Sequence, residues 1–159
     1  MTSGRRAAAA LPSRDMSGEV HEVEGVAGTE QVAASVAMKL EAGGVVRLSG
    51  DLGAGKTHFV RGLVKALGGD GGLVSSPTYV LLQTYDLADD RRLHHLDAYR
   101  VGGPSAFDEI GFDELLDDAA AGDVVAVEWP ERVEEVLPTS AIRIDIEHAG
   151  EGRRRITVR

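Results

Sequence analysis

The sequence predicts a small α/β fold of three layers, in which a mixed, mainly parallel central sheet lies between helices. Two observations lead to this prediction. Strand-like and helix-like segments alternate along most of the chain, and residues 124–127 form a wholly apolar run of the kind buried inside a parallel sheet. The length of 159 residues suits one domain with one core. We expect this domain to span 19–159 and to follow a disordered leader over 1–18, whose apolar run is too short for a secretory signal.

The first half of the chain predicts two helices around a buried strand. Thr29 is the expected N-cap of a helix that ends before the glycines at 43–44. The apolar run 45–49 is expected to form a buried strand, and 56–67 an amphipathic helix, because its apolar residues recur at helical spacing. Four glycines within 68–72 end this helix and favour a hinge before the next segment.

The middle of the chain predicts a β-hairpin and then a helix. Residues 79–86 and 92–97 have strand character and are joined by the turn-like sequence 88–91. Residues 106–121 are expected to be helical, with an interruption at Gly111.

The last part of the chain predicts three strands and one short helix. The apolar run 124–127 is a buried strand that ends at Glu128, and 131–137 is expected to form a short helix. Apolar residues alternate over 142–146 and again over 156–158, which is typical of strands with one buried face.

Residues 50–57, Gly-Asp-Leu-Gly-Ala-Gly-Lys-Thr, fit the phosphate-loop pattern G-x-x-x-x-G-K-[ST] without mismatch. The predicted strand before it and the predicted helix after it are the context that the motif requires. The glycines let successive backbone N–H groups point at an anion, Lys56 would bind the β and γ phosphates, and Thr57 would bind Mg²⁺. The pattern therefore predicts a P-loop NTPase-like fold. The predicted nucleotide-binding residues of this segment are Asp51, Leu52, Gly53, Ala54, Gly55, Lys56, Thr57 and His58.

A phosphate loop needs an acidic partner for the metal, usually at the end of a neighbouring strand. Asp97 and Glu128 each end a predicted strand, and spacing alone does not say which of them holds metal and which orients water. We predict Lys56, Asp97 and Glu128 as catalytic residues, and Thr57, Asp97 and Glu128 as metal ligands. His95 lies two residues before Asp97, but without a third matched ligand it is expected, like its neighbour at 94, to pack or to form hydrogen bonds.

One further segment and one further residue lie close to these motifs in the sequence. Ser76, Pro77, Thr78 and Tyr79 follow the glycine hinge, and Ser76 or Thr78 could report the γ-phosphate from a mobile loop. Trp129, the only tryptophan, follows directly after one of the candidate carboxylates. A solitary tryptophan is more typical of core packing than of a functional platform.

The composition excludes several classes of function. The formal charge of −9, from 17 basic and 26 acidic residues, argues against a protein that grips nucleic acid alone through a broad basic face, so any RNA is expected to be held by a partner. The arginines at 153–155 and 159 are expected to be a solvated strand end. The chain has no cysteine, which rules out disulfides and thiolate metal sites and favours the cytoplasm. No stretch approaches the length of a membrane span.

Taken together, the motifs resemble one family. Five segments come in the order and approximate spacing of the TsaE (YjeE) family, over roughly Thr29 to Ile146: Gly50 to Thr57, Ser76 to Tyr79, His95 to Arg100, Glu109 to Phe112 and Glu128 to Pro130. The resemblance implies an ATPase that uses ATP and Mg²⁺ and supports threonylcarbamoyladenosine synthesis on tRNAs that read codons beginning with adenine. It also implies a partner, the TsaB–TsaD heterodimer, in which TsaD transfers the threonylcarbamoyl group and through which the chain would meet tRNA indirectly. DNA and membranes are not expected as partners.

The resemblance also implies residue roles. Lys56 looks like the family's phosphate-binding lysine and Thr57 like its Mg²⁺ ligand, while Asp97 and Glu128 look like its acidic pair for metal and attacking water. The loop 76–79 resembles a switch-like loop.

Three further positions follow from the resemblance. Trp129 resembles a neighbour of the site, and Thr29 lies where the family's first helix approaches the adenine. His58 departs from the pattern, because many relatives carry a second threonine or another small residue there.

Two other interpretations of the phosphate loop remain open. A small-molecule kinase would need an arginine-bearing lid and an acceptor pocket, and apart from Arg91, Arg92 and Arg100 no segment is placed to serve as either. A GTP-dependent switch would need the Asn-Lys-x-Asp signature that reads guanine, and the chain contains no asparagine. The sequence therefore favours ATP.

Overall fold

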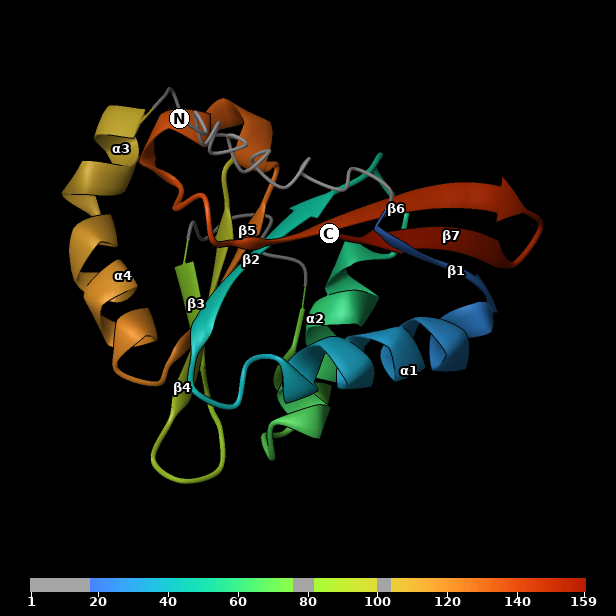
Figure 1. The fold of residues 1–159 in the computed structure, drawn as a ribbon, viewed down its shortest axis with the longest axis horizontal. Coiled ribbons are helices and arrows are strands. Elements are labelled where there is room, and N and C mark those ends of the chain that lie inside the picture. Colours follow the sequence, from blue (N-terminus) through green and yellow to red (C-terminus); the bar gives the residue numbers. More distant parts are fainter. Residues whose placement is uncertain (1–17, 76–81, 100–103) are drawn as a thin grey trace, which may run out of the picture.

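The computed structural model describes residues 18–75, 82–99 and 104–159 and has one sheet flanked by helices (Figure 1). The strands are β1 (Glu19–Glu24), β2 (Gly44–Ser49), β3 (Leu82–Asp86), β4 (Arg92–Asp97), β5 (Val124–Glu128), β6 (Ile142–Gly150) and β7 (Arg153–Val158). The helices are α1 (Gly25–Met38), α2 (Lys56–Ala66), α3 (Pro104–Glu109) and α4 (Phe112–Ala120).

The sheet is mixed, with a parallel centre and antiparallel margins. Its strand order is β1-β7-β6-β2-β5-β4-β3. Strands β6, β2, β5 and β4 run parallel, whereas β3 pairs antiparallel with β4, β7 with β6, and β1 with β7. The predicted mixed sheet with a mainly parallel centre is confirmed.

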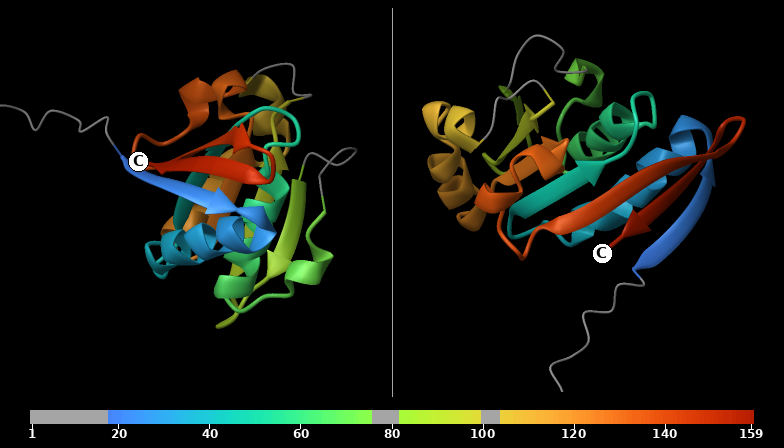
Figure 2. Two further views of the ribbon diagram at one scale, coloured as in Figure 1. Left: turned by 90° about the vertical axis from the view of Figure 1, so that its right-hand side faces the viewer. Right: turned by 90° about the horizontal axis from the view of Figure 1, so that it is seen from above.

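Two apolar cores lie on opposite faces of the sheet, which gives the three predicted layers (Figures 1 and 2). Strand β5 shows why. All five of its residues are buried, and they alternate: Val124 and Ala126 belong to the core under α1 and α2, and Val125 and Val127 to the core under α3 and α4. A central parallel strand is covered on both faces, so it reads as an unbroken apolar run.

The sheet brings three chain segments to one edge. Strand β2 ends at Ser49 and is followed by the phosphate loop, after which α2 begins at Lys56. The neighbouring strands β5 and β4 end in register, with Asp97 opposite Glu128 and Glu128 opposite Leu48. The carboxyl edge of a parallel sheet is where open α/β folds bind their ligands, so this edge is the candidate site.

The start of the structured chain differs from the prediction. Residues 19–24, for which no strand was predicted, form β1, and α1 begins directly after it at Gly25. Thr29 is therefore buried in the interior of α1, and its prediction as the N-cap was wrong. The helix starts at a contact distant in sequence: the backbone N–H of Gly25 donates to the carbonyl of Gly152 at 2.8 Å.

The prediction of one short helix over 131–137 was also wrong. Two separate 3₁₀ turns, Pro130–Arg132 and Glu134–Val136, occupy this stretch. Val133 lies between them with φ −134° and ψ 27°, outside helical geometry, so an α-helix cannot continue through it.

The remaining predicted elements are confirmed within the described residues. The hairpin turns at Asp89 and Asp90, which both have positive φ, and the helical region after 104 splits at Gly111, whose φ is 75°. The predicted strand 79–86 is described only from Leu82 onward, and the predicted leader lies outside the described residues except for Gly18.

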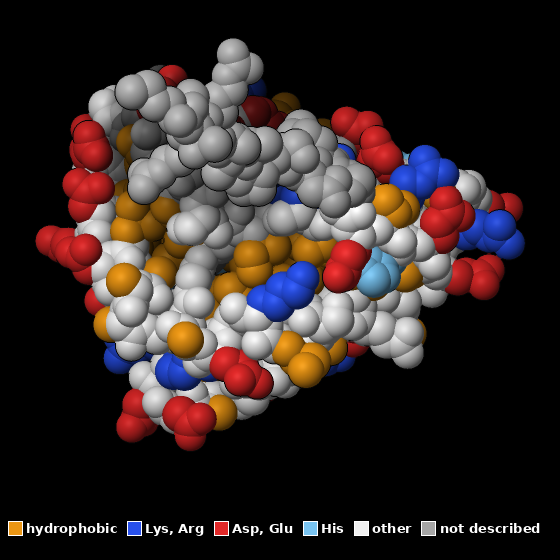
Figure 3. Space-filling view, in the orientation of Figure 1, with side chains coloured by type: hydrophobic (Ala, Val, Ile, Leu, Met, Phe, Trp, Pro, Cys, Tyr) orange, Lys and Arg blue, Asp and Glu red, His pale blue; other side chains and the backbone are white. Residues whose placement is uncertain are grey.

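Acidic side chains gather along the edge formed by α3 and α4 (Figure 3). The segment 104–121 contains six acidic residues and no basic residue. This edge therefore repels the phosphate backbone of RNA. Among the described residues, no helix is both long enough and apolar enough to cross a bilayer.

Candidate nucleotide-binding site

Gly55 and Gly50 show why the path of the phosphate loop requires glycine. Gly55 precedes α2 with φ 114°, a left-handed conformation that residues with a Cβ rarely adopt. A Cβ on Gly50 would lie 2.6 Å from the carbonyl oxygen of Ile146 on β6, so the loop leaves β2 in close contact with its neighbour. The sequence thus folds into the tight turn that the motif predicts.

Lys56, the first residue of α2, is folded back over the loop. Its Nζ donates to the carbonyl oxygen of Gly50 at 2.6 Å and lies 3.7 Å from the ring centroid of Trp129. The side chain is buried, and this burial lowers the pKa of Lys56, while the carboxylates of Glu128 and Asp97 act in the opposite direction. Lys56 is thus an ammonium in low-dielectric surroundings, held by a carbonyl and an aromatic face.

A pocket of about 440 Å³ lies in front of this lysine. It is lined by the phosphate loop, the start of α2 and the residues that end or follow β4 and β5. The lining residues are Leu52, Gly53, Gly55, Lys56, Thr57, His58, Asp97, Tyr99, Glu128 and Trp129. Residues predicted from separate motifs are therefore brought to one cavity.

Three residues that were predicted to bind nucleotide do not line this pocket. Ala54 is buried beneath the loop, and Asp51 is exposed on its other side. Thr29 is buried on α1, so its expected approach to the adenine stays a prediction. The switch-like loop 76–79 and Arg100 lie outside the described residues.

The two candidate carboxylates sit side by side on paired strands. Asp97 is half-buried, and its pKa is raised, mainly by this burial and also by the negative charge of Glu128. The backbone N–H of Tyr99, 2.8 Å from Oδ1 of Asp97, acts in the opposite direction. Glu128 is 4% exposed, and its Oε1 lies 3.3 Å from Nε2 of His95. The site therefore concentrates negative charge at the carboxyl edge of the sheet, opposite Lys56.

The donor set around the pocket fits a magnesium ion. Thr57 offers a hydroxyl, and Asp97 and Glu128 offer carboxylates, the hard oxygen donors that Mg²⁺ prefers. Glu128 is almost fully buried and still lines the pocket, so a cation bound there would offset the cost of burying its charge.

An aromatic pair extends the pocket wall. The ring centroids of Tyr99 and Trp129 lie 4.9 Å apart, and the guanidinium carbon of Arg132 lies 5.2 Å from the Tyr99 ring centroid. Trp129 is only partly buried and forms this wall, although it also packs against the core under α3 and α4. Tyr99 was not predicted as a site residue, and the signal available for it was its position in the motif 95–100.

Arg154 was missed for a different reason. The arginines near the C-terminus were expected to be a solvated strand end, but Arg154 on β7 reaches the phosphate loop, where its Nε donates to the carbonyl oxygen of Ala54 at 2.8 Å. Arg155 pairs with Glu22 on β1 at 2.8 Å. No local pattern could have revealed the first contact, since it joins residues 100 positions apart.

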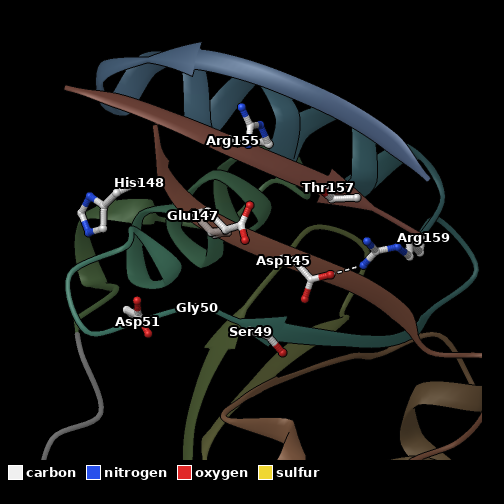
Figure 4. Close-up of a pocket in the computed structure, with 10 residues that line it drawn as sticks. Ser49, Gly50, Asp51, Asp145, Glu147, His148, Arg155, Thr157 and Arg159 are labelled. Carbon is white, nitrogen blue, oxygen red and sulfur yellow. Dashed lines mark hydrogen bonds and ion pairs between the residues drawn. The ribbon is translucent and has the colours of Figure 1, made fainter. Parts of the chain in front are cut away.

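A larger pocket, of about 620 Å³, lies beside the first part of the phosphate loop over β6 and β7 (Figure 4). Figure 4 shows Asp145, Glu147 and Thr157 on these strands and Arg159 just after the end of β7. Arg159 pairs with Asp145 within the pocket, so part of the charge there is neutralised by the chain itself. This pocket contains neither the loop lysine nor the carboxylates at the ends of β4 and β5, and we assign the candidate site to the smaller pocket.

A histidine cluster at the opposite end of β4 and β5 is explained by hydrogen bonding. His94, Asp118 and Asp123 place potential ligand atoms within 4.8 Å of one another. Both ring nitrogens of His94 are engaged, however, with Asp123 at 3.0 Å and with Thr84 at 3.1 Å. The prediction that His94 forms hydrogen bonds is confirmed.

Comparison with known proteins gives a consistent family match. A family model described as "Threonylcarbamoyl adenosine biosynthesis protein TsaE" matches residues 23–156. Two curated proteins named "tRNA threonylcarbamoyladenosine biosynthesis protein TsaE" are similar: that of Streptomyces coelicolor is 41% identical over 72% of this chain and 75% of its own, and that of Bacillus subtilis is 36% identical over 81% and 77%. A crystal structure of Bacillus subtilis YdiB has a TM-score of 0.65 and 30% identity over 88% of this chain and 83% of its own.

Proposed function

The chain belongs to the TsaE family, which acts in tRNA threonylcarbamoyladenosine biosynthesis, and from this premise we propose that it is a P-loop ATPase. It would bind and hydrolyse ATP with Mg²⁺ in the cytoplasm and support the modification through the TsaB–TsaD heterodimer. The observation that carries the proposal is the pocket in which Lys56, Thr57, Asp97 and Glu128 meet in front of the phosphate loop.

The loop and Lys56 would bind the triphosphate. Backbone N–H groups of the loop and of the first turn of α2 attract an anion, since the helix dipole is positive at this end. Lys56 would exchange the carbonyl oxygen of Gly50 for phosphate oxygens, which are stronger acceptors because they are charged. The aromatic face of Trp129 keeps the ammonium beside the pocket until a phosphate arrives.

Thr57 and the two carboxylates would hold the magnesium ion and the attacking water. When bound, the ion would neutralise the negative charge that develops on the phosphates. Asp97 and Glu128 share these two tasks in our proposal: one holds metal, and the other accepts a hydrogen bond from water and orients it. The turnover and nucleotide affinity of Asp97→Ala and Glu128→Ala, measured separately, divide the tasks between them.

We expect slow turnover by the chain alone. Among the described residues, no arginine lines the pocket, so the positive charge that an arginine finger brings to phosphoryl transfer is missing there. A partner that supplies or positions such a charge would raise kcat, and we propose that TsaB–TsaD is this partner.

The proposal is tested by phosphate release with and without TsaB–TsaD. We expect slow release by the chain with ATP and Mg²⁺, a clear increase when the heterodimer is added, and capture of the heterodimer by the tagged chain in ATP. The matched controls are Lys56→Ala, which should lose the activity, and Lys65→Ala on the same helix, which should keep it. Transfer of phosphate to a small metabolite with no response to TsaB–TsaD would overturn the proposal in favour of a kinase.

A further inference from the structure

His95 is a fully buried histidine directly beside the candidate site. It lies on β4 two residues before Asp97, and its exposed fraction is 0%. Its Nε2 atom is 3.3 Å from Oε1 of Glu128 on the neighbouring strand. Among the described residues, neither ring nitrogen of His95 nor this oxygen has a hydrogen bond of normal geometry. The two side chains are therefore close polar neighbours that lack other hydrogen bonds at these atoms.

This arrangement is costly unless the two groups interact. A buried imidazole or carboxylate without a partner loses its hydration and gains nothing in return. The rings of Tyr85 and His95 lie 6.4 Å apart between centroids, and the Tyr85 hydroxyl donates to Oε1 of Gln83. Oε1 of Glu128, 3.3 Å from Nε2, is thus an acceptor within reach of a buried N–H of His95.

We propose that His95 is a positioning residue for Glu128. The Nε2–H would turn onto Oε1, which lies 3.3 Å from Nε2, and this bond would restrict the carboxylate so that the second oxygen stays available to the pocket that Lys56 and Asp97 also line. A hydrogen bond from a neighbouring residue commonly orients a carboxylate that binds metal or water. The neutral ring with its proton on Nε2 and the protonated ring both present this donor, so the role does not depend on the charge of His95.

The inference rests on the proposed function for its effect on turnover, but the contact itself is testable without nucleotide. Urea unfolding of the wild type, His95→Leu, Glu128→Ala and the double variant forms a double-mutant cycle. Each single variant should lose unfolding free energy, because either change alone leaves a buried group unpaired. We expect the sum of these two losses to exceed the loss measured for the double variant. Additive shifts would show that the two side chains do not interact and would overturn the inference.

The second arm measures ATP turnover with TsaB–TsaD present. We expect His95→Leu to reduce kcat, or to raise the Mg²⁺ concentration needed for half-maximal rate, by about tenfold or more, while ATP affinity in EDTA is unchanged. His95→Gln places an amide donor near the position of Nε2 and should recover most of the loss. The effect should vanish in the Glu128→Ala background, since His95 acts through that carboxylate.

His94→Leu is the matched control, because His94 is the adjacent buried histidine on β4 and does not line the pocket. It should lower stability and keep turnover. Wild-type turnover by His95→Leu, or an equal loss in His94→Leu, would overturn the positioning role. A wild-type chain that never hydrolyses ATP would instead count against the proposed function, while a coupled unfolding cycle would still establish the contact.

Discussion

Replacing Lys56 with methionine removes one charge from the pocket and keeps a long unbranched side chain. A hydrogen bond between an ammonium and a charged acceptor contributes about 1.5–3 kcal/mol, and each 1.4 kcal/mol corresponds to tenfold in affinity. In the wild type, part of this gain is offset because Nζ must first leave the Gly50 carbonyl and the Trp129 ring. We therefore expect Lys56→Met to weaken ATP binding by about ten- to hundredfold.

The assay is displacement of a fluorescent ATP analogue, followed by anisotropy in the presence of Mg²⁺. Lys65→Met is the control, because Lys65 lies on the same helix, pairs with Glu30 at 3.1 Å and does not line the pocket. Its ATP affinity should equal that of the wild type. Equal affinities for Lys56→Met and the wild type would refute the assignment of the phosphates to this loop.

Three further predictions concern pH, packing and the loop. Burial raises the pKa of Asp97 in the folded chain above its value in the unfolded chain. The folded state is therefore destabilised when the pH lies above the raised pKa, and this loss disappears when the pH falls well below the ordinary aspartate pKa. Thermal unfolding of the nucleotide-free chain should therefore show Asp97→Asn to be more stable than the wild type at pH 7, by a margin that shrinks as the pH falls. Gly62→Ala should destabilise the chain by about 1 kcal/mol or more in urea unfolding. The new Cβ would lie 2.7 Å from Cβ of Ala33, and this clash outweighs the gain in helix propensity. A stabilised variant would contradict this expectation. Arg154→Met should raise the ATP dissociation constant severalfold and lower the unfolding free energy by about 1 kcal/mol, because the bond to the Ala54 carbonyl is lost. An unchanged dissociation constant would show that this bond does not shape the loop for ATP.

The sequence predicted those parts of the fold whose signal is local. Strands β2 and β5 were predicted within a residue, because strands buried on both faces read as apolar runs such as 124–127, whereas β6 extends to Gly150, four residues beyond the predicted 142–146. Strand β1 was missed because its side chains are mostly exposed and Val20 is 55% exposed, so no buried face repeats along it. Its pairing with β7, which includes the ion pair of Glu22 and Arg155, depends on residues at the far end of the chain.

The same distinction holds for the candidate site. Lys56 and Thr57 follow from a contiguous motif, and Asp97 and Glu128 from the positions at which predicted strands end. Their convergence on one pocket depends on the strand order, since β4 and β2 both pair with β5. The contacts of Arg154 with the loop and of His95 with Glu128 depend on side chains from different strands, which spacing along the chain does not reveal.

A calorimetric titration of the folded chain with ATP and Mg²⁺ tests the central claim most directly. We predict a saturable heat of binding in the millimolar range of ATP, and a much weaker signal for Lys56→Met. Measurement at two temperatures guards against a heat that passes through zero, because apolar burial changes the heat capacity. A well-folded chain that gives no heat at either temperature would contradict the account.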